Sequence, residues 1–141
     1  ILESNALVVR KSVKYAPLFK MLTSGRFDCF SRSVSEVLPE LEQHSASGIE
    51  LERRLLLIYR LPTFFFVSRD NPQLAKRVED GMRQMVEDGS LEQFIRASYA
   101  SQFAQVALQQ RIPVMLDNPL LSEQTQAILA EPALWMDPLA K

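Results

Sequence analysis

Three consecutive polar residues carry the most recognisable ligand-binding chemistry of this chain. Ser31, Arg32 and Ser33 follow the short predicted strand Phe27–Phe30 and precede a predicted helix. Free backbone N–H groups at a helix N-terminus attract anions, and an arginine adds a fork of donors. We therefore expect Ser31, Arg32 and Ser33 to bind a small ligand. In the simpler alternative, the serines cap the helix and Arg32 pairs with Glu36.

Other residue types give little support for catalysis or metal binding. The chain has one histidine, His44, and one cysteine, Cys29. It lacks a G-x-S-x-G elbow, a glycine-rich phosphate loop and the spacing of a zinc site, so we expect no catalytic residue, no metal and no cofactor. Cys29 lies between two phenylalanines, and we expect a buried, unreactive thiol. The acidic residues near Glu36 and Glu40 are expected on a solvated helix face.

Composition limits the class of protein. The 141 residues are 47% hydrophobic and 23% charged, which is typical of a globular chain, and the net charge of -1 gives no reason to expect nucleic acid as a partner. The longest apolar runs are too short to cross a bilayer. The sequence begins at Ile1 without a signal-peptide pattern, and we expect a fragment that begins inside a domain.

The first part of the chain predicts alternating strands and helices. We expect a strand at Leu7–Val9, a helix that starts between Ser12 and Ala16 and ends at Gly25, a strand at Phe27–Phe30, and a helix after Ser33. Short connections between such elements favour a parallel sheet, so the predicted fold class is α/β.

The second part predicts longer helices around further strands. We expect buried strands at Leu55–Tyr59 and Phe64–Val67, and an edge strand at Ile112–Leu116 despite Pro113. The aromatic run Phe64–Phe66 could line a pocket, but we favour a place in the core. Helices are predicted from Pro72 to Asp88, from Leu91 to about Gln109 and from Ser122 to Ala130.

The order of these elements resembles the C-terminal part of type II periplasmic solute-binding proteins, the family 3 group of amino-acid ABC importers. The resemblance rests on motifs that follow one another at matching spacing between Leu18 and Tyr99. They are Leu18–Leu22 with Gly25-Arg26-Phe27-Asp28, Phe64-Phe65-Phe66-Val67-Ser68 with Asn71-Pro72-Gln73-Leu74, and Asp88-Gly89-Ser90-Leu91.

The resemblance implies a fragment of a two-lobed binder, with a three-layer parallel-sheet lobe, a hinge and C-terminal helices. Residues 1–62 would belong to the second lobe, and residues 63–141 would cross the hinge into the first lobe. The implied function is closure around a small polar ligand, with a membrane-bound ABC permease as partner and the periplasm as location. Strands of the first lobe would lie outside this chain, so we also expect self-association of the fragment.

One departure from the family pattern affects the kind of ligand that we expect. In amino-acid-binding relatives an aspartate grips the ligand ammonium, and the matching position here is Ser33, preceded by Arg32. This difference favours an anionic ligand over an α-amino acid held in the usual way. Two alternatives use the same fold: a ligand-sensing regulatory domain, and the front domain of a lytic transglycosylase-like enzyme.

Overall fold

Sequence signals for helix ends act as expected in the computed structural model, which describes residues 1–140. Pro17 opens α1 (Pro17–Thr23), and Gly25 follows its end with a φ of 69°. The N–H of Gly25 donates to the Leu22 carbonyl at 3.0 Å, and the N–H of Arg26 donates to Met21 at 3.0 Å. This pair of bonds forms a Schellman motif, which satisfies the last carbonyls of α1.

The other helices also begin near the predicted positions. Asn71 caps α3 (Pro72–Glu87) by accepting a hydrogen bond from the Leu74 N–H at 3.1 Å, and Ser122 caps α5 (Glu123–Leu129) in the same way. The remaining α-helices are α2 (Val34–Gln43) and α4 (Ser90–Gln105). Single 3-10 turns, η1 to η4, occupy Glu3–Asn5, Ser45–Ser47, Leu108–Gln110 and Pro132–Leu134.

Within residues 1–140, one parallel pair of strands forms the sheet. β1 (Leu55–Ile58) pairs with β2 (Ile112–Met115), with Leu55 opposite Ile112 and Ile58 opposite Met115. Pro113, which has no N–H, lies in β2, and the two-stranded sheet leaves β2 at an edge, as predicted. The mixture of helices with parallel strands confirms an α/β chain in this broad sense.

Three predicted strands are wrong. Leu7–Val9 and Phe27–Phe30 are irregular, and Phe64–Val67 is not part of the sheet. A strand needs a neighbour for its backbone N–H and C=O groups, and no described segment pairs with these three. Cys29, in the second of them, is exposed and not buried as expected.

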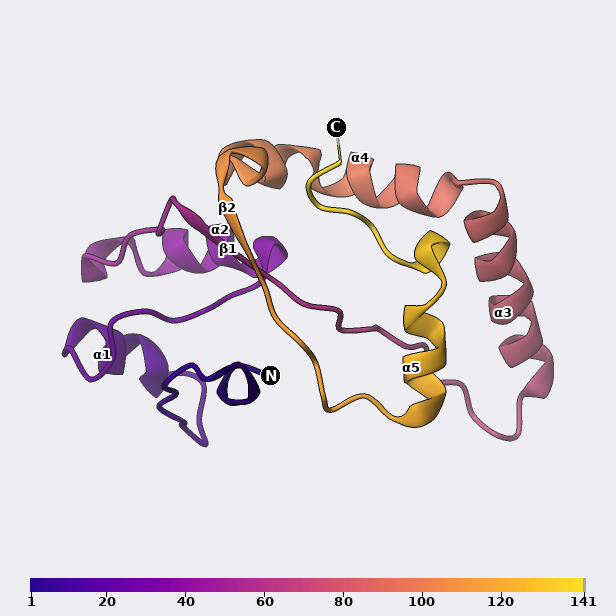
Figure 1. Cartoon of the computed structure of the whole chain (residues 1–141), viewed down its shortest axis with the longest axis horizontal. Helices are drawn as coiled ribbons and strands as arrows, with labels where there is room; N and C mark the ends of the chain where they lie inside the picture. Colours follow the sequence, from indigo (N-terminus) through magenta and orange to yellow (C-terminus); the bar gives the residue numbers. More distant parts are fainter. Residues whose placement is uncertain (141) are drawn as a thin grey trace.

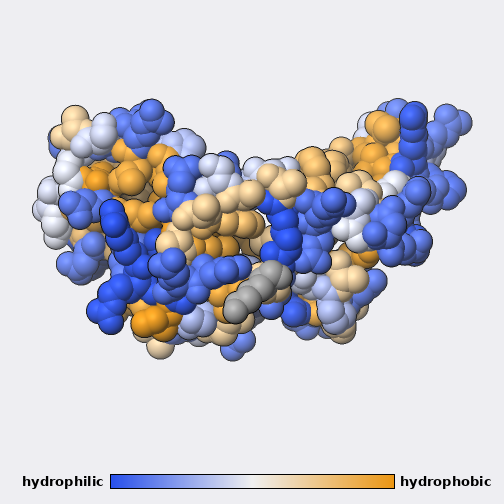
Figure 2. Space-filling view, turned by 90° about the horizontal axis from the view of Figure 1, so that it is seen from above, coloured by the Kyte–Doolittle hydropathy of each residue, from blue (hydrophilic) through white to orange (hydrophobic). Residues whose placement is uncertain are grey.

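The chain forms an open frame. In Figure 1, α1 and α2 lie at one end, α3 and α5 lie at the other, and the β1/β2 pair crosses between them. The solvent-accessible area is 11242 Å², whereas a compact monomer of 16.1 kDa would expose about 7,400 Å². Figure 2 shows hydrophobic surface at both ends of the face it presents. Much of the apolar surface is therefore not covered by residues 1–140.

The expected core at Phe64–Phe66 is the clearest case. These three side chains are 53%, 69% and 96% exposed, which contradicts their predicted burial. The buried apolar side chains among the described residues are Phe19, Val106 and Leu108. None of the helices in residues 1–140 is both long and apolar enough to span a bilayer.

Candidate functional site

Of the three predicted ligand residues, Arg32 lies in a compact side-chain cluster. Nε and Nη2 of Arg32 donate to the two carboxylate oxygens of Glu40 at 2.6 and 2.5 Å, and Nη2 lies 3.2 Å from a Glu36 oxygen. Tyr15 also donates its hydroxyl to Glu40. The alternative in which Arg32 pairs with Glu36 is therefore present, with Glu40 as a second and closer partner.

Aromatic rings surround this ion pair. The Arg32 guanidinium lies 5.0 Å from the ring centroid of Tyr15 and 5.3 Å from that of Phe30. Phe19 packs edge-on against Phe30 at 5.5 Å and stacks on His44 at 3.8 Å. We call this group the Arg32 cluster. It consists of Tyr15, Phe19, Phe30, Arg32, Glu40 and His44.

The cluster changes the ionisation of its carboxylate. Hydrogen bonds from Arg32, and next from Tyr15, hold the pKa of Glu40 below its usual value of 4.5 against the opposing effect of burial. A hydrogen bond to Glu40 correspondingly raises the pKa of Arg32. The guanidinium is thus already paired with carboxylates, so its main role in this structure is to join α2 to the segment that precedes it.

The two serines are placed differently. Ser31 is exposed, and Ser33 occupies the N-cap position of α2, but its side chain makes no hydrogen bond to the helix backbone. The Ser33 hydroxyl instead donates to a Glu36 oxygen at 2.7 Å. The ligand-binding role of Ser31, Arg32 and Ser33 stays a prediction.

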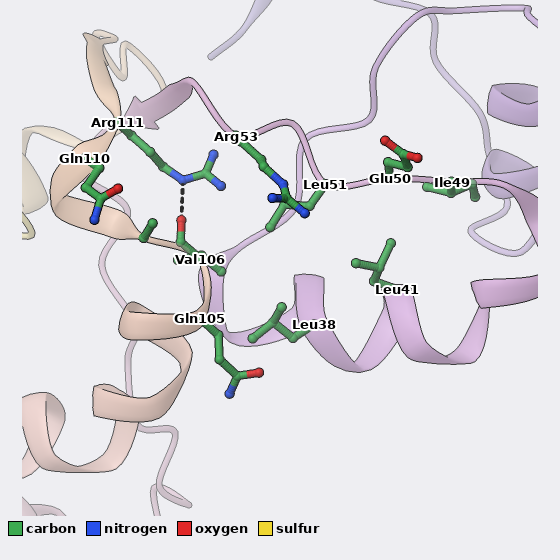
Figure 3. A pocket seen from close by; sticks show the side chains of 11 residues that line it. Leu38, Leu41, Ile49, Glu50, Leu51, Arg53, Gln105, Val106, Gln110 and Arg111 are labelled. Atoms are coloured by element: carbon green, nitrogen blue, oxygen red, sulfur yellow. Dashed lines mark hydrogen bonds between the residues drawn. The ribbon is translucent and has the colours of Figure 1, made fainter.

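A cavity of about 690 Å³ lies elsewhere, between the α2 region and the end of α4 (Figure 3). This volume is in the range of small-molecule sites. Residues from both predicted lobe portions line it. They are Leu38, Leu41, Ile49, Glu50, Leu51 and Arg53 from the first portion, and Gln105, Val106, Ala107, Gln110 and Arg111 from the second.

Arg111 fixes one wall of this cavity. Its side chain is only 6% exposed, and its Nε donates to the Val106 carbonyl at 2.7 Å. Its Nη1 donates to the carbonyls of Glu52 at 2.7 Å and Leu55 at 3.0 Å. These bonds join the end of α4 to the start of β1, while Nη2 makes no hydrogen bond to residues 1–140.

Arg53 supplies a second guanidinium. It is exposed and has no hydrogen bond or ion pair within the described part of the chain. In Figure 3 its side chain extends from the segment before β1 toward Leu38, and the Arg111 side chain extends toward Arg53. An arginine keeps its charge at all physiological pH values, so Arg53 leaves a permanent positive charge in the cavity wall.

Two glutamates lie near these arginines. Glu52 accepts hydrogen bonds from the N–H groups of Leu55 and Arg54, which lower its pKa, and its carboxylate lies 3.7 Å from Arg111. Glu50 lines the cavity, but Figure 3 shows its carboxylate pointing away from Leu41. The Arg111 charge is thus balanced by Glu52, whereas that of Arg53 is not paired.

Sequence reasoning missed Arg53 and Arg111. The only local signal was the Glu52-Arg53-Arg54 run before a predicted strand, and such charges usually lie on a solvated surface. Residues 1–140 contain no group of three or more His, Cys, Asp or Glu side chains arranged to hold a metal ion. Comparison of the chain with protein-family models, with curated proteins and with solved structures found no match to any of them.

Proposed function

We propose that this chain is part of a periplasmic solute-binding protein of the type II class, which closes around a small polar ligand for an ABC-type permease. The observation that carries the proposal is the cavity of about 690 Å³ where residues 38–53 meet residues 105–111. These segments come from the portions that the family resemblance assigns to different lobes. A cleft between lobes is the place where a closing binder holds its ligand.

The connections between the two ends of the molecule also support this proposal. β1 and β2 run side by side across the middle, and each strand is followed by an extended segment (Figure 1). The Asn118 side chain donates to the Arg60 carbonyl at 2.9 Å, which joins these two segments after the strands. Few, extended connections are the usual form of a hinge, because a small number of dihedral changes can reorient whole lobes.

Closure would follow from binding at this cavity. A ligand that contacts both lobes binds the closed state more tightly than the open state and shifts the population toward it. Arg53 comes from the segment before β1, and Val106 from the end of α4. A ligand that touches both residues would therefore stabilise the state in which their two segments lie close together. In this proposal the transported solute is the ligand and no reaction takes place.

The test uses the full gene product that contains this chain. A panel of amino acids, sugars, carboxylates and inorganic phosphate is screened by thermal shift, and any hit is measured by calorimetry. Small-angle scattering with and without the hit then reports the radius of gyration, which should fall on closure. Absence of binding across the panel, or binding with an unchanged radius, would refute the proposal.

A further inference from the structure

The lining of the cavity specifies its ligand more narrowly than the proposed function does. Most of the side chains that line it are aliphatic, with Leu38 and Leu41 on α2 and Ile49, Leu51 and Val106 around them. In Figure 3, Leu38 and Leu41 point from α2 toward the segment that carries Arg53. Such a wall favours a hydrocarbon group, because burial of each methylene group stabilises the complex by about 0.8 kcal/mol.

The charges of the cavity add a second requirement. Glu52 balances Arg111, whereas no described residue pairs with Arg53. Glu50 also lines the cavity, but its carboxylate points away from Leu41 (Figure 3), so the Arg53 guanidinium is left to pair with a ligand. Nη2 of Arg111, which makes no hydrogen bond to residues 1–140, is a further donor at the same wall. A guanidinium binds a carboxylate through parallel N–H···O bonds, which are about twice as strong as neutral hydrogen bonds.

We infer that this cavity binds an organic monoanion with an apolar body, whose carboxylate contacts Arg53 and whose hydrocarbon part packs on Leu38 and Leu41. This inference rests on the proposed function and names its ligand class. It also moves the anion site from Arg32, whose charge is already paired, to Arg53. A zwitterionic amino acid fits less well. Its ammonium group, one carbon away from the carboxylate, would lie close to the Arg53 guanidinium, and the two positive charges repel.

The experiment compares four probes in the full gene product by calorimetry. 4-Methylpentanoate has both the carboxylate and the apolar body, 4-methylpentanamide has the body without the charge, acetate has the charge without the body, and L-leucine adds an ammonium group. We expect 4-methylpentanoate to bind at least ten-fold more tightly than each of the other three.

Variants then assign the contacts. Arg53→Gln should weaken 4-methylpentanoate binding at least ten-fold and leave binding of the amide unchanged. Leu41→Ala should weaken 4-methylpentanoate binding and leave that of acetate unchanged. Arg77→Gln is the matched control, since Arg77 is an exposed arginine on α3 outside the cavity lining. Arg111 is left intact, because its bonds to three carbonyls hold the wall together.

The outcomes separate this inference from the proposed function. Equal or tighter binding of the amide or of L-leucine overturns the monoanion inference and leaves a solute binder. The same holds if only sugars or other neutral solutes from the wider panel bind. If no solute binds at all, both proposals fall. If Arg53→Gln binds 4-methylpentanoate as tightly as the unchanged protein does, the assignment of Arg53 is wrong.

Discussion

Two phenylalanine-containing regions of this chain reach opposite degrees of burial. Phe19 in α1 is 8% exposed, whereas Phe66 in the extended segment after β1 is 96% exposed. Phe19 has neighbours on nearby elements, because Phe30 and His44 both pack against its ring. Phe66 lies in a segment whose backbone has no partner strand within residues 1–140. The comparison shows that an aromatic residue on a helix can be buried by side chains of neighbouring elements, while an extended segment depends on a partner strand.

The exposed region should drive the largest effect, which is self-association of the 141-residue chain. Phe65 and Phe66 are 69% and 96% exposed, and burial of each could contribute about 1.5–3 kcal/mol. We expect the chain to form dimers or swapped assemblies at high concentration. The double substitution Phe65→Asp with Phe66→Asp should raise the dissociation constant more than about 100-fold, measured by sedimentation equilibrium.

A matched control tests whether the effect belongs to this segment. Val13 is fully exposed in the loop before α1, so Val13→Asp should leave the dissociation constant unchanged. Light scattering that reports only monomer for the unchanged chain at high concentration would contradict the prediction. A purely monomeric chain would also mean that exposed phenylalanines at Phe65 and Phe66 are tolerated without a partner.

The buried region should give the next largest effect, on folding stability. Phe19→Ala removes a ring that contacts Tyr15, Phe30 and His44, and we expect a loss of about 3 kcal/mol in the free energy of unfolding. Phe66→Ala, measured at a concentration where the chain is monomeric, should change it by less than about 0.5 kcal/mol. Urea denaturation followed by circular dichroism compares the two, and equal losses would remove the distinction between the regions.

The ion pair within the Arg32 cluster should contribute less and depend on pH. Glu40→Gln removes charge-assisted hydrogen bonds to a side chain that is 22% exposed, and we expect a loss of about 2 kcal/mol at pH 7. Because the folded state holds the pKa of Glu40 below 4.5, this stabilisation is complete above pH 4.5. It decreases as the pH falls through the lowered pKa of the folded state.

The measurement is urea denaturation of both proteins at several pH values. The difference between the unchanged chain and Glu40→Gln should shrink as the solution becomes more acidic. Glu42→Gln is the control, because Glu42 is exposed and makes no hydrogen bond within residues 1–140. A difference that stays constant from pH 7 to pH 3 would show that the Glu40 carboxylate does not act through its charge.

Local sequence signals predicted those parts of the fold that local contacts determine. Pro17, Gly25, Asn71 and Ser122 mark helix ends in the sequence and in the structure. Pro17 acts through its fixed φ angle, and the other three act through hydrogen bonds that span at most five residues, so no distant information is needed. A buried strand was also predicted at Leu55–Tyr59. The structure has it as β1 (Leu55–Ile58), paired in parallel with β2, but Leu55 is 49% exposed and not buried as expected.

Elements that depend on distant partners were not predictable in this way. Phe27–Phe30 has a strand-like composition, but Phe30 packs against Phe19 and the Arg32 guanidinium, and the segment remains irregular. The cavity arginines are a further example. Arg53 and Arg111 are far apart in the sequence, and the pairing of β1 with β2 and the Arg111 hydrogen bonds to Glu52 and Leu55 bring their segments to one wall. Neither residue lies in a motif that suggests ligand binding.

The smallest predicted effect compares two helix starts. At α3 the Asn71 side chain accepts a hydrogen bond from the Leu74 N–H, so Asn71→Ala should lower the free energy of unfolding by about 1 kcal/mol. At α2 the Ser33 hydroxyl bonds to the side chains of Glu36 and Ser35 and not to the helix backbone. Ser33→Ala should therefore cost only a few tenths of a kcal/mol, typical of an exposed substitution, or about 0.5 at most.

Urea denaturation of the two alanine variants distinguishes a residue that satisfies a backbone donor from one that only occupies the same position. A loss for Ser33→Ala as large as that for Asn71→Ala would mean that the hydroxyl caps α2 in solution, as its place in the sequence suggests. Retained stability would leave Ser33 free of a structural role at this position. The Arg32 cluster would then owe its stability to the guanidinium, the carboxylate and the rings, and not to the serine beside them.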